Sequence, residues 1–323
     1  MPKRDAAEFP LLKYLDSLVE NLRKLVPPAI KGEDEDAVHD ARVATRRLKA
    51  ATDLLTPAIS DRYRKPFNRV AKCLRRQLGP LRDLDVMLEH LGEFKQPALQ
   101  PATRWMGERL SEIRNNAVKR AADKAPPARM LARLGSWWGL HHEIAGAMDR
   151  IGELLSQSVH LQLDAFVEQA NDLTGPRLSD PHELRIAGKS LRYTLEMARQ
   201  QGVRLPASVT TLFKRMQTAL GLWHDYVVLA ERMMRESVES ELALHDPQLQ
   251  MQVLKLTQFT LTKAQGQLNK MANLWKTRGE WLMQTIRAAF PLTKHPDVTP
   301  DVETPFLEPD SPVVVESNSA PAA

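Results

Sequence analysis

Hydrophobic residues recur every three or four positions along most of the chain, which is the spacing of amphipathic helices. Proline and glycine interrupt this pattern and mark where one helix ends and the next begins. No stretch shows the alternation of apolar and polar residues that a half-buried strand requires, so we predict an all-α fold. The predicted helices span roughly residues 10 to 26, 34 to 56, 61 to 92, 98 to 122, 128 to 170, 181 to 201, 206 to 240 and 247 to 290. The dipeptide Gly79-Pro80 is expected to break or kink the third helix.

Two short sequence elements occur twice, in the same order. The first is V-H-D-A-R-V-A-T-R-R-L-K at residues 38 to 49, echoed as P-H-E-L-R-I-A-G-K-S-L-R-Y at residues 181 to 193. The second is K-C-L-R-R-Q-L-G-P-L-R-D-L-D-V at residues 72 to 86, echoed as K-R-M-Q-T-A-L-G-L-W-H-D-Y-V-V at residues 214 to 228. Repeats of this kind govern the architecture of a fold.

The spacing of the two elements is nearly the same in both copies. His39 and Asp83 are 44 positions apart, and His182 and Asp225 are 43 positions apart. We therefore predict two pseudo-symmetric helical bundles that arose by internal duplication, within one domain at residues 1 to 294. The halves would run from about 10 to 125 and from about 135 to 290.

In the first element, the basic residues share one helical face. At 100° per residue they lie within an arc of about 80°, opposite a face of small and apolar residues such as Ala41, Ala44 and Leu48. Arg47 lies beyond the edge of this arc. The row consists of His39, Arg42, Arg46 and Lys49 in the first copy, and of His182, Arg185, Lys189 and Arg192 in the second.

The second element repeats this geometry. Its shared face carries Lys72, Arg75, Arg76, Gly79 and Arg82 in one copy, and Lys214, Gly221 and His224 in the other. Packing the two kinds of helix side by side would line a basic groove between the bundles. Asp83 and Asp225 are acidic exceptions, and we predict that they orient an Arg or His and do not contact an anion.

These residue types suit phosphate. The arginine fork makes paired hydrogen bonds to phosphate oxygens, and lysine acts as a point charge. Histidine becomes cationic near neutral pH, so binding is expected to strengthen as the pH falls. The faces repel one another unless an anion supplies the missing charge, which predicts a long phosphate polyanion as the ligand.

The net charge supports an anionic partner without identifying it. The formal charge is +5, but residues 295 to 323 contain six acids and no Lys or Arg, so residues 1 to 294 carry +11. Nucleic acid, a membrane surface and polyphosphate all fit such an excess. The acidic, proline-rich segment 295 to 323 is expected to be a disordered tail. The chain shows no secretory signal and no long apolar run, so we expect a cytoplasmic protein without membrane insertion.

Other interpretations remain open. A basic helix face is often only a solvated surface, and His39 and His182 could serve at the starts of their helices. The pairs His39-Asp40 and His224-Asp225 are reminiscent of metal-dependent phosphohydrolases, but nearby Arg and Lys disfavour a divalent cation. We therefore expect no catalytic residues, metal or cofactor. Nucleic acid is the alternative partner, because phosphate contacts carry no base information.

The four motifs together resemble the CHAD family, the conserved-histidine α-helical domain, over about residues 10 to 290. The resemblance implies two pseudo-symmetric bundles around a basic groove that binds inorganic polyphosphate and, in several bacteria, carries the protein to polyphosphate granules. Granules and granule-associated proteins are then possible partners. Many relatives add a triphosphatase module with a Glu-x-Glu-x-Lys strand, which this sequence lacks, so the chain resembles a stand-alone, non-catalytic binder.

The resemblance places binding positions at His39, Arg42, Arg46, Lys49, Lys72, Arg76, Arg82, His182, Arg185, Lys189, Arg192 and Lys214. Arg47, Arg75, Tyr193 and His224 complete our predicted binding residues. The copies differ where Arg82 matches His224 and where Arg47 matches Ser190, so the halves need not bind equally.

Overall fold

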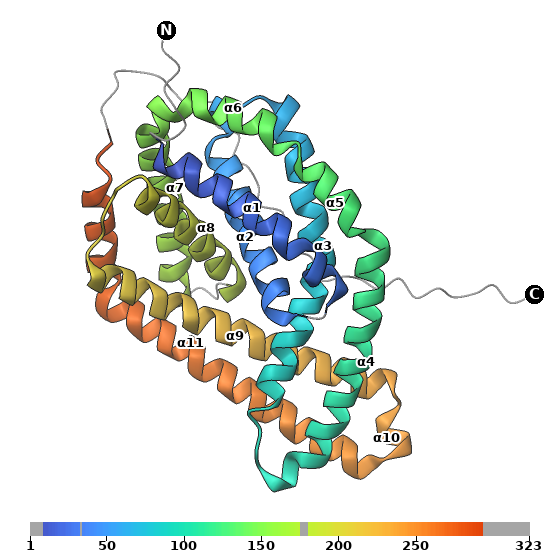
Figure 1. Cartoon of the computed structure of the whole chain (residues 1–323). Helices are drawn as coiled ribbons and strands as arrows, with labels where there is room; N and C mark the ends of the chain where they lie inside the picture. Colours follow the sequence, from blue (N-terminus) through green and yellow to red (C-terminus); the bar gives the residue numbers. More distant parts are fainter. Residues whose placement is uncertain (1–8, 33, 175–179, 293–323) are drawn as a thin grey trace, which may run out of the picture. The chain divides into compact units, whose positions relative to one another are not determined.

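The computed structural model describes residues 9–32, 34–174 and 180–292, and within these ranges it contains helices and no strand (Figure 1). The helices are α1 (Pro10–Lys31), α2 (Glu35–Leu54), α3 (Asp61–Leu91), α4 (Gln100–Lys124), α5 (Pro127–Leu134), α6 (Trp137–Ala147), α7 (Ile151–Thr174), α8 (Pro181–Gln200), α9 (Ala207–Glu239), α10 (Leu242–His245) and α11 (Pro247–Ala289). Short 3-10 turns lie at Thr56–Ala58, Pro97–Leu99 and Met148–Arg150. The predicted all-α class is confirmed.

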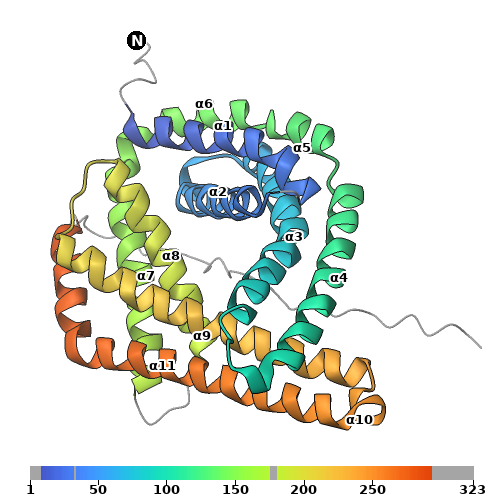
Figure 2. The same cartoon turned by 60° about the horizontal axis from the view of Figure 1, so that its bottom comes forward.

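The helices pack mainly against their neighbours in the sequence. α1 lies along α2, α2 along α3, α3 along α4, and α7 along α8. The longest pairing joins α9 to α11, which run side by side for most of their length (Figure 2). The helices that carry the four motifs also meet across the chain, because α2 contacts α8 and α3 contacts α9. The predicted internal duplication stays a prediction.

The predicted core face of α2 is buried. Ala41, Ala44 and Leu48 are between 0 and 4 % exposed, and Leu184 and Leu191 of α8 are fully buried. Each helix therefore turns its apolar side to the core, which leaves the opposite, basic side outside the hydrophobic packing.

Three details differ from the sequence predictions. The first helix continues through Pro27 and Pro28 and ends only at Gly32, which adopts a left-handed conformation (φ 69°). The predicted segment 128 to 170 is divided among α5, α6 and α7, with Gly135 following the first of them. The third helix does not break at Pro80, because burial of Leu78 and Leu81 on either side of it outweighs the loss of one backbone donor. The predicted tail, 295 to 323, lies outside the described residues.

Candidate functional site

Aspartate residues fix the starts of α2 and α8. The Asp34 side chain accepts a hydrogen bond of 3.0 Å from the backbone N–H of Ala37, and the Asp180 side chain accepts one of 2.8 Å from the N–H of His182. Such caps stabilise helix starts. The capping role that the sequence left open for His39 and His182 is therefore filled by aspartates.

Arg42 connects α2 to α3. Its side chain is 11 % exposed and lies 3.5 Å from the carboxylate of Asp83, and its Nη1 is 3.5 Å from the carbonyl oxygen of Arg75. A Cβ at Gly79 would lie 2.7 Å from this Nη1, closer than real Cβ contacts. The glycine of the second motif therefore leaves space for the arginine of the first. Arg75 forms a second link between α3 and α2, because its Nη1 donates a hydrogen bond of 3.1 Å to the carbonyl oxygen of Thr45.

Basic residues from α2 and α8 converge around Lys189. Burial lowers the pKa of Lys189 well below its usual range, and the charges of Arg185, Arg46 and Arg42 lower it further, while Asp225 opposes them. Arg42, Arg46, Arg185 and Lys189 are therefore electrostatic neighbours, and we call them the central basic cluster. The motif register had predicted that these four residues would share faces.

Two histidines and an aspartate border this cluster. The rings of His182 and His224 stack with their centroids 5.6 Å apart, and His224 Nδ1 lies 3.2 Å from an oxygen of Asp225. Burial lowers the pKa of His224; Arg185 and Lys189 add to this, and Asp225 opposes it. Burial alone would raise the pKa of Asp225, but the hydrogen bond with His224 and the nearby ring of His90 hold it well below its usual range. Asp225 is thus an ionised counter-charge inside the site.

Three further predicted residues of α2 and α8, Arg47, Lys49 and Arg192, contact acidic side chains. Arg47 Nε lies 2.8 Å from a carboxylate oxygen of Glu196, whose other oxygen is 3.6 Å from Arg192 Nη1. Lys49 pairs with Asp53 at 2.7 Å. The Arg192 guanidinium carbon lies 4.7 Å from the ring centroid of Tyr193, which is only 7 % exposed. Tyr193 thus supports Arg192 from beneath, and the binding roles of these residues stay predictions.

The other predicted positions lie further out. Lys72, Arg76 and Lys214 are exposed on α3 and α9. His39 is exposed on α2, and burial of part of its ring, followed by the charge of Arg82, lowers its pKa. Arg82 is therefore close to His39.

Sequence reasoning missed His90 and Glu196. His90, at the end of α3, is 6 % exposed and binds Glu93 through Nδ1 at 2.7 Å, and its Nε2 lies 3.9 Å from Asp225. Glu93 also accepts hydrogen bonds from Tyr226 and Lys263. Glu93 is only three residues from His90, but Asp225, Tyr226 and Lys263 come from distant helices, and no local sequence pattern indicates those contacts.

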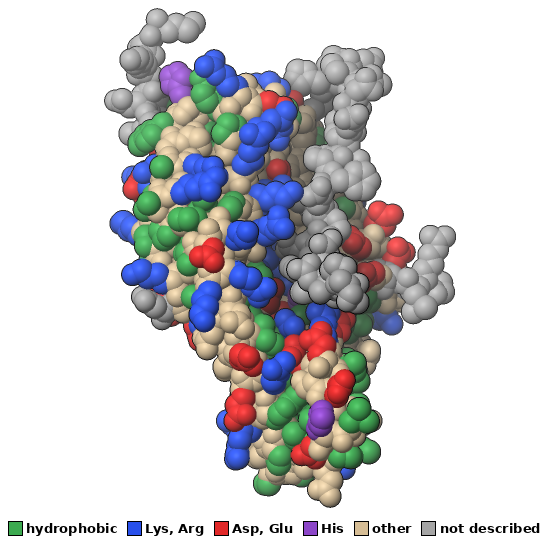
Figure 3. All heavy atoms as spheres, turned by 90° about the vertical axis from the view of Figure 1, so that its right-hand side faces the viewer, with side chains coloured by type: hydrophobic (Ala, Val, Ile, Leu, Met, Phe, Trp, Pro, Cys, Tyr) green, Lys and Arg blue, Asp and Glu red, His purple; other side chains and the backbone are tan. Residues whose placement is uncertain are grey.

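Basic side chains are not confined to the central cluster. On the outer face formed by α4 and α5, Lys and Arg side chains are spread over α5 and the end of α4, and acidic side chains become frequent towards α10 (Figure 3). The exposed bases there include Lys119, Arg120, Lys124, Arg129 and Arg133. Charge alone therefore does not identify the site. The stronger indication is that predicted residues from α2, α3, α8 and α9 lie close together.

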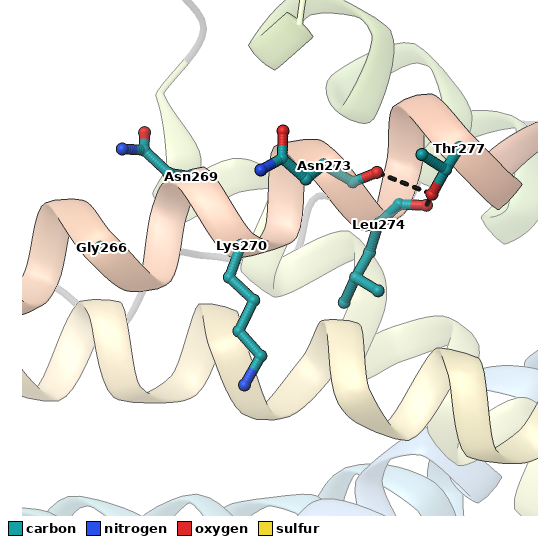
Figure 4. A pocket seen from close by; sticks show the side chains of 6 residues that line it. All are labelled: Gly266, Asn269, Lys270, Asn273, Leu274 and Thr277. Atoms are coloured by element: carbon teal, nitrogen blue, oxygen red, sulfur yellow. Dashed lines mark hydrogen bonds between the residues drawn. The ribbon is translucent and has the colours of Figure 1, made fainter.

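A hollow on α11 is separate from all of these residues. It is lined by Gly266, Asn269, Lys270, Asn273, Leu274 and Thr277 (Figure 4). It contains none of the predicted binding residues and has a single charged side chain among its six lining residues. Within the described ranges, no cluster of three His, Cys, Asp or Glu side chains is placed to hold a metal ion, and no helix is long and apolar enough to cross a membrane.

Comparison with known proteins gives the same answer as the motifs. The family model named CHAD domain matches residues 13–234, which include α2, α3, α8 and most of α9. The crystal structure of the CHAD domain from the plant Ricinus communis aligns over 86% of this chain and 92% of its own, with a TM-score of 0.58 and 22% sequence identity. A comparison with curated protein sequences found no match. The motifs, their helices and the family match together assign the chain to the CHAD domain family.

Proposed function

We propose that the chain binds inorganic polyphosphate, without chemical change to it, at the central basic cluster. The observation that carries this proposal is the convergence of Arg42, Arg46, Arg185 and Lys189 from two helices that are distant in the sequence. Such a concentration of like charge is unfavourable in the free protein and becomes favourable when an anion is bound.

Two carboxylates described near the cluster, Asp83 and Asp225, are each limited in how they can pair with it. Asp83 is 57 % exposed and lies 3.5 Å from Arg42, a long separation for an ion pair. Asp225 is shared with His224 and His90. Three arginines lie close to Lys189, whose own pKa they help to lower, and this gathering of basic groups favours a ligand with several phosphates.

Arginine and lysine would have different roles in this site. The guanidinium groups of Arg42, Arg46 and Arg185 would each bind two phosphate oxygens, and Lys189 would supply a compact charge. Lys72, Arg76 and Lys214 would contact phosphates further along the chain. Since linear polyphosphate carries charge on every phosphate, binding at several positions also suits the proposed localisation at polyphosphate granules.

We further infer that the protein is a binder and not a phosphohydrolase. Phosphoryl transfer needs a group that positions or activates the attacking nucleophile. Asp225, the carboxylate beside the cluster, has its pKa held low and is hydrogen-bonded to histidine, which suits a fixed counter-charge better than a general base.

A competition titration tests this function. Long polyphosphate should displace labelled ligand at lower concentration than duplex DNA or RNA at the same ionic strength, and its affinity should fall steeply as salt is raised. No phosphate should be released. Equal preference for nucleic acid would support the alternative partner, and release of phosphate would show an enzyme.

Binding should also take up protons. Because the pKa values of His39 and His224 are lowered from 6.5, both rings are neutral near pH 7 in the free protein, and an anion favours their charged forms. Affinity should therefore rise between pH 8 and pH 6, and calorimetry in buffers of different ionisation enthalpy should detect the uptake. Binding that is independent of pH in this range would contradict the placement of these rings at the site.

In the free protein, His39 and His224 make folding less stable as the pH falls, whereas polyphosphate binding becomes stronger. The unfolded chain binds protons at His39 and His224 more readily than the folded chain does. Their contribution to stability is therefore present above pH 6.5 and is lost as the pH falls from 6.5 through the lowered pKa values. Added polyphosphate should compensate for this loss.

A further inference from the structure

A row of exposed basic side chains extends along α3 outside the central basic cluster. Arg62, Lys65, Arg69, Lys72 and Arg76 follow one another at intervals of three or four residues, and all five are exposed. On a helix they occupy an arc of about 80° and span about 21 Å. The first three belong to neither repeated motif, and we call the five residues the α3 basic row.

The α3 basic row leads to the central cluster. The same helical face continues from Arg76 through Gly79 to Asp83. At that point the Arg42 guanidinium approaches the Gly79 backbone and lies 3.5 Å from Asp83. A linear ligand bound at Arg42 would therefore meet the row as it leaves the cluster.

The row is electrostatically unfavourable for the protein alone. Residues 62 to 82 contain no Asp or Glu. Like charges three and four residues apart destabilise a helix, and bases in the first turns oppose the helix dipole. Asp61 binds Lys65 at 2.6 Å and also pairs with Arg64, whereas no carboxylate among the described residues pairs with Arg62 or Arg69. A bound polyanion would relieve this repulsion.

The corresponding face of α9 lacks such a row. In the register that aligns Lys72 with Lys214, three bases of α3 correspond to uncharged residues of α9. Lys65, Arg69 and Arg76 match Ala207, Thr211 and Thr218. Arg62 matches Arg204, which precedes α9, so α9 itself does not continue the row and the two ends of the site differ.

We propose that the α3 basic row is a second phosphate-binding segment, which holds the part of a linear polyphosphate that extends beyond the central cluster. This proposal rests on the function proposed above and adds a direction to it. The ligand leaves the cluster along α3, and the site selects long chains over short ones.

The variant Arg62→Gln plus Arg69→Gln tests the row. Its affinity for long polyphosphate should fall roughly 5-fold, and the slope of log affinity against log salt should decrease by roughly 1.4, because two phosphate contacts are lost. Its affinity for tripolyphosphate, which is too short to extend along α3, should not change.

The matched control is Arg129→Gln plus Arg133→Gln. These two arginines are also exposed on a helix, and no described carboxylate pairs with them. The control should keep the wild-type affinity and salt slope. Three results would contradict the proposed role of the α3 basic row: an equal loss of affinity in the two variants, no loss of affinity in the row variant, or an equal loss of affinity for tripolyphosphate. If the wild-type protein did not bind long polyphosphate at all, the proposed function would be wrong as well. If the wild type bound it and the row variant bound it equally well, only the role of the α3 basic row would be wrong.

Discussion

Replacing Arg42 and Arg185 together with alanine should weaken the binding of long polyphosphate by about 100-fold or more. Each arginine offers a charge-assisted, two-point contact worth about 1.5–3 kcal/mol, and the two come from different helices, α2 and α8. The measurement is a titration of long polyphosphate against wild-type and variant protein at one ionic strength.

Two control variants and a stability measurement show whether a loss of affinity comes from lost phosphate contacts, from lower net charge or from unfolding. Arg129→Ala plus Arg133→Ala removes the same charge from α5 and should change the affinity by less than about 3-fold. Arg42→Lys plus Arg185→Lys keeps the charge but loses the planar fork, so its affinity should lie between those of the wild type and the alanine variant. An alanine variant that keeps its thermal stability and still binds like the wild type would exclude the cluster as the site.

Arg114→Ala should reduce the free energy of unfolding by about 3–5 kcal/mol, because it leaves a buried charge without a partner. The Asp85 side chain is completely buried, with Arg114 Nε at 2.5 Å from one oxygen. Arg114 also donates to the carbonyl oxygen of Gly32 at 3.2 Å, so one side chain joins α3, α4 and the end of α1. Urea denaturation followed by circular dichroism gives the free energy.

The matched control for this variant is Arg287→Ala. Arg287 pairs with Asp164 between α11 and α7, but its side chain is 43% exposed and that of Asp164 is 58% exposed. Exposed ion pairs contribute at most about 1 kcal/mol, so this change should have a small effect. Similar losses for the two variants would show that burial does not determine the strength of the Asp85 pair.

The positions of helices and of their basic faces could be predicted because both depend on nearby residues. Periodicity located α2 and α8 to within a residue or two, and Asp180, directly before Pro181 in the sequence, caps α8. The same local signals allowed a break at Pro80, where the helix instead continues because packing of the flanking leucines overrides a residue that disfavours helix.

The partners of the basic residues could not be predicted, because they depend on which helices meet. Arg47 and Arg192 were predicted to face phosphate, yet both approach Glu196, and Arg47 does so across the contact between α2 and α8. His90, which belongs to neither repeated motif, lies with its Nε2 3.9 Å from Asp225 beside the cluster. Sequence periodicity shows the face of a helix but not the helix that lies opposite.

The close approach of Arg42 to Gly79 means that site function can be lost without altering the net charge. A methyl group at position 79 would need space within 2.7 Å of the guanidinium, and a flexible arginine end can move away more easily than a helix can unfold. Gly79 and Arg42 thus form an epistatic pair. A variant with every Lys and Arg intact could fold normally and yet present its key arginine in the wrong place, and a survey of this family that counts only basic residues would overlook it.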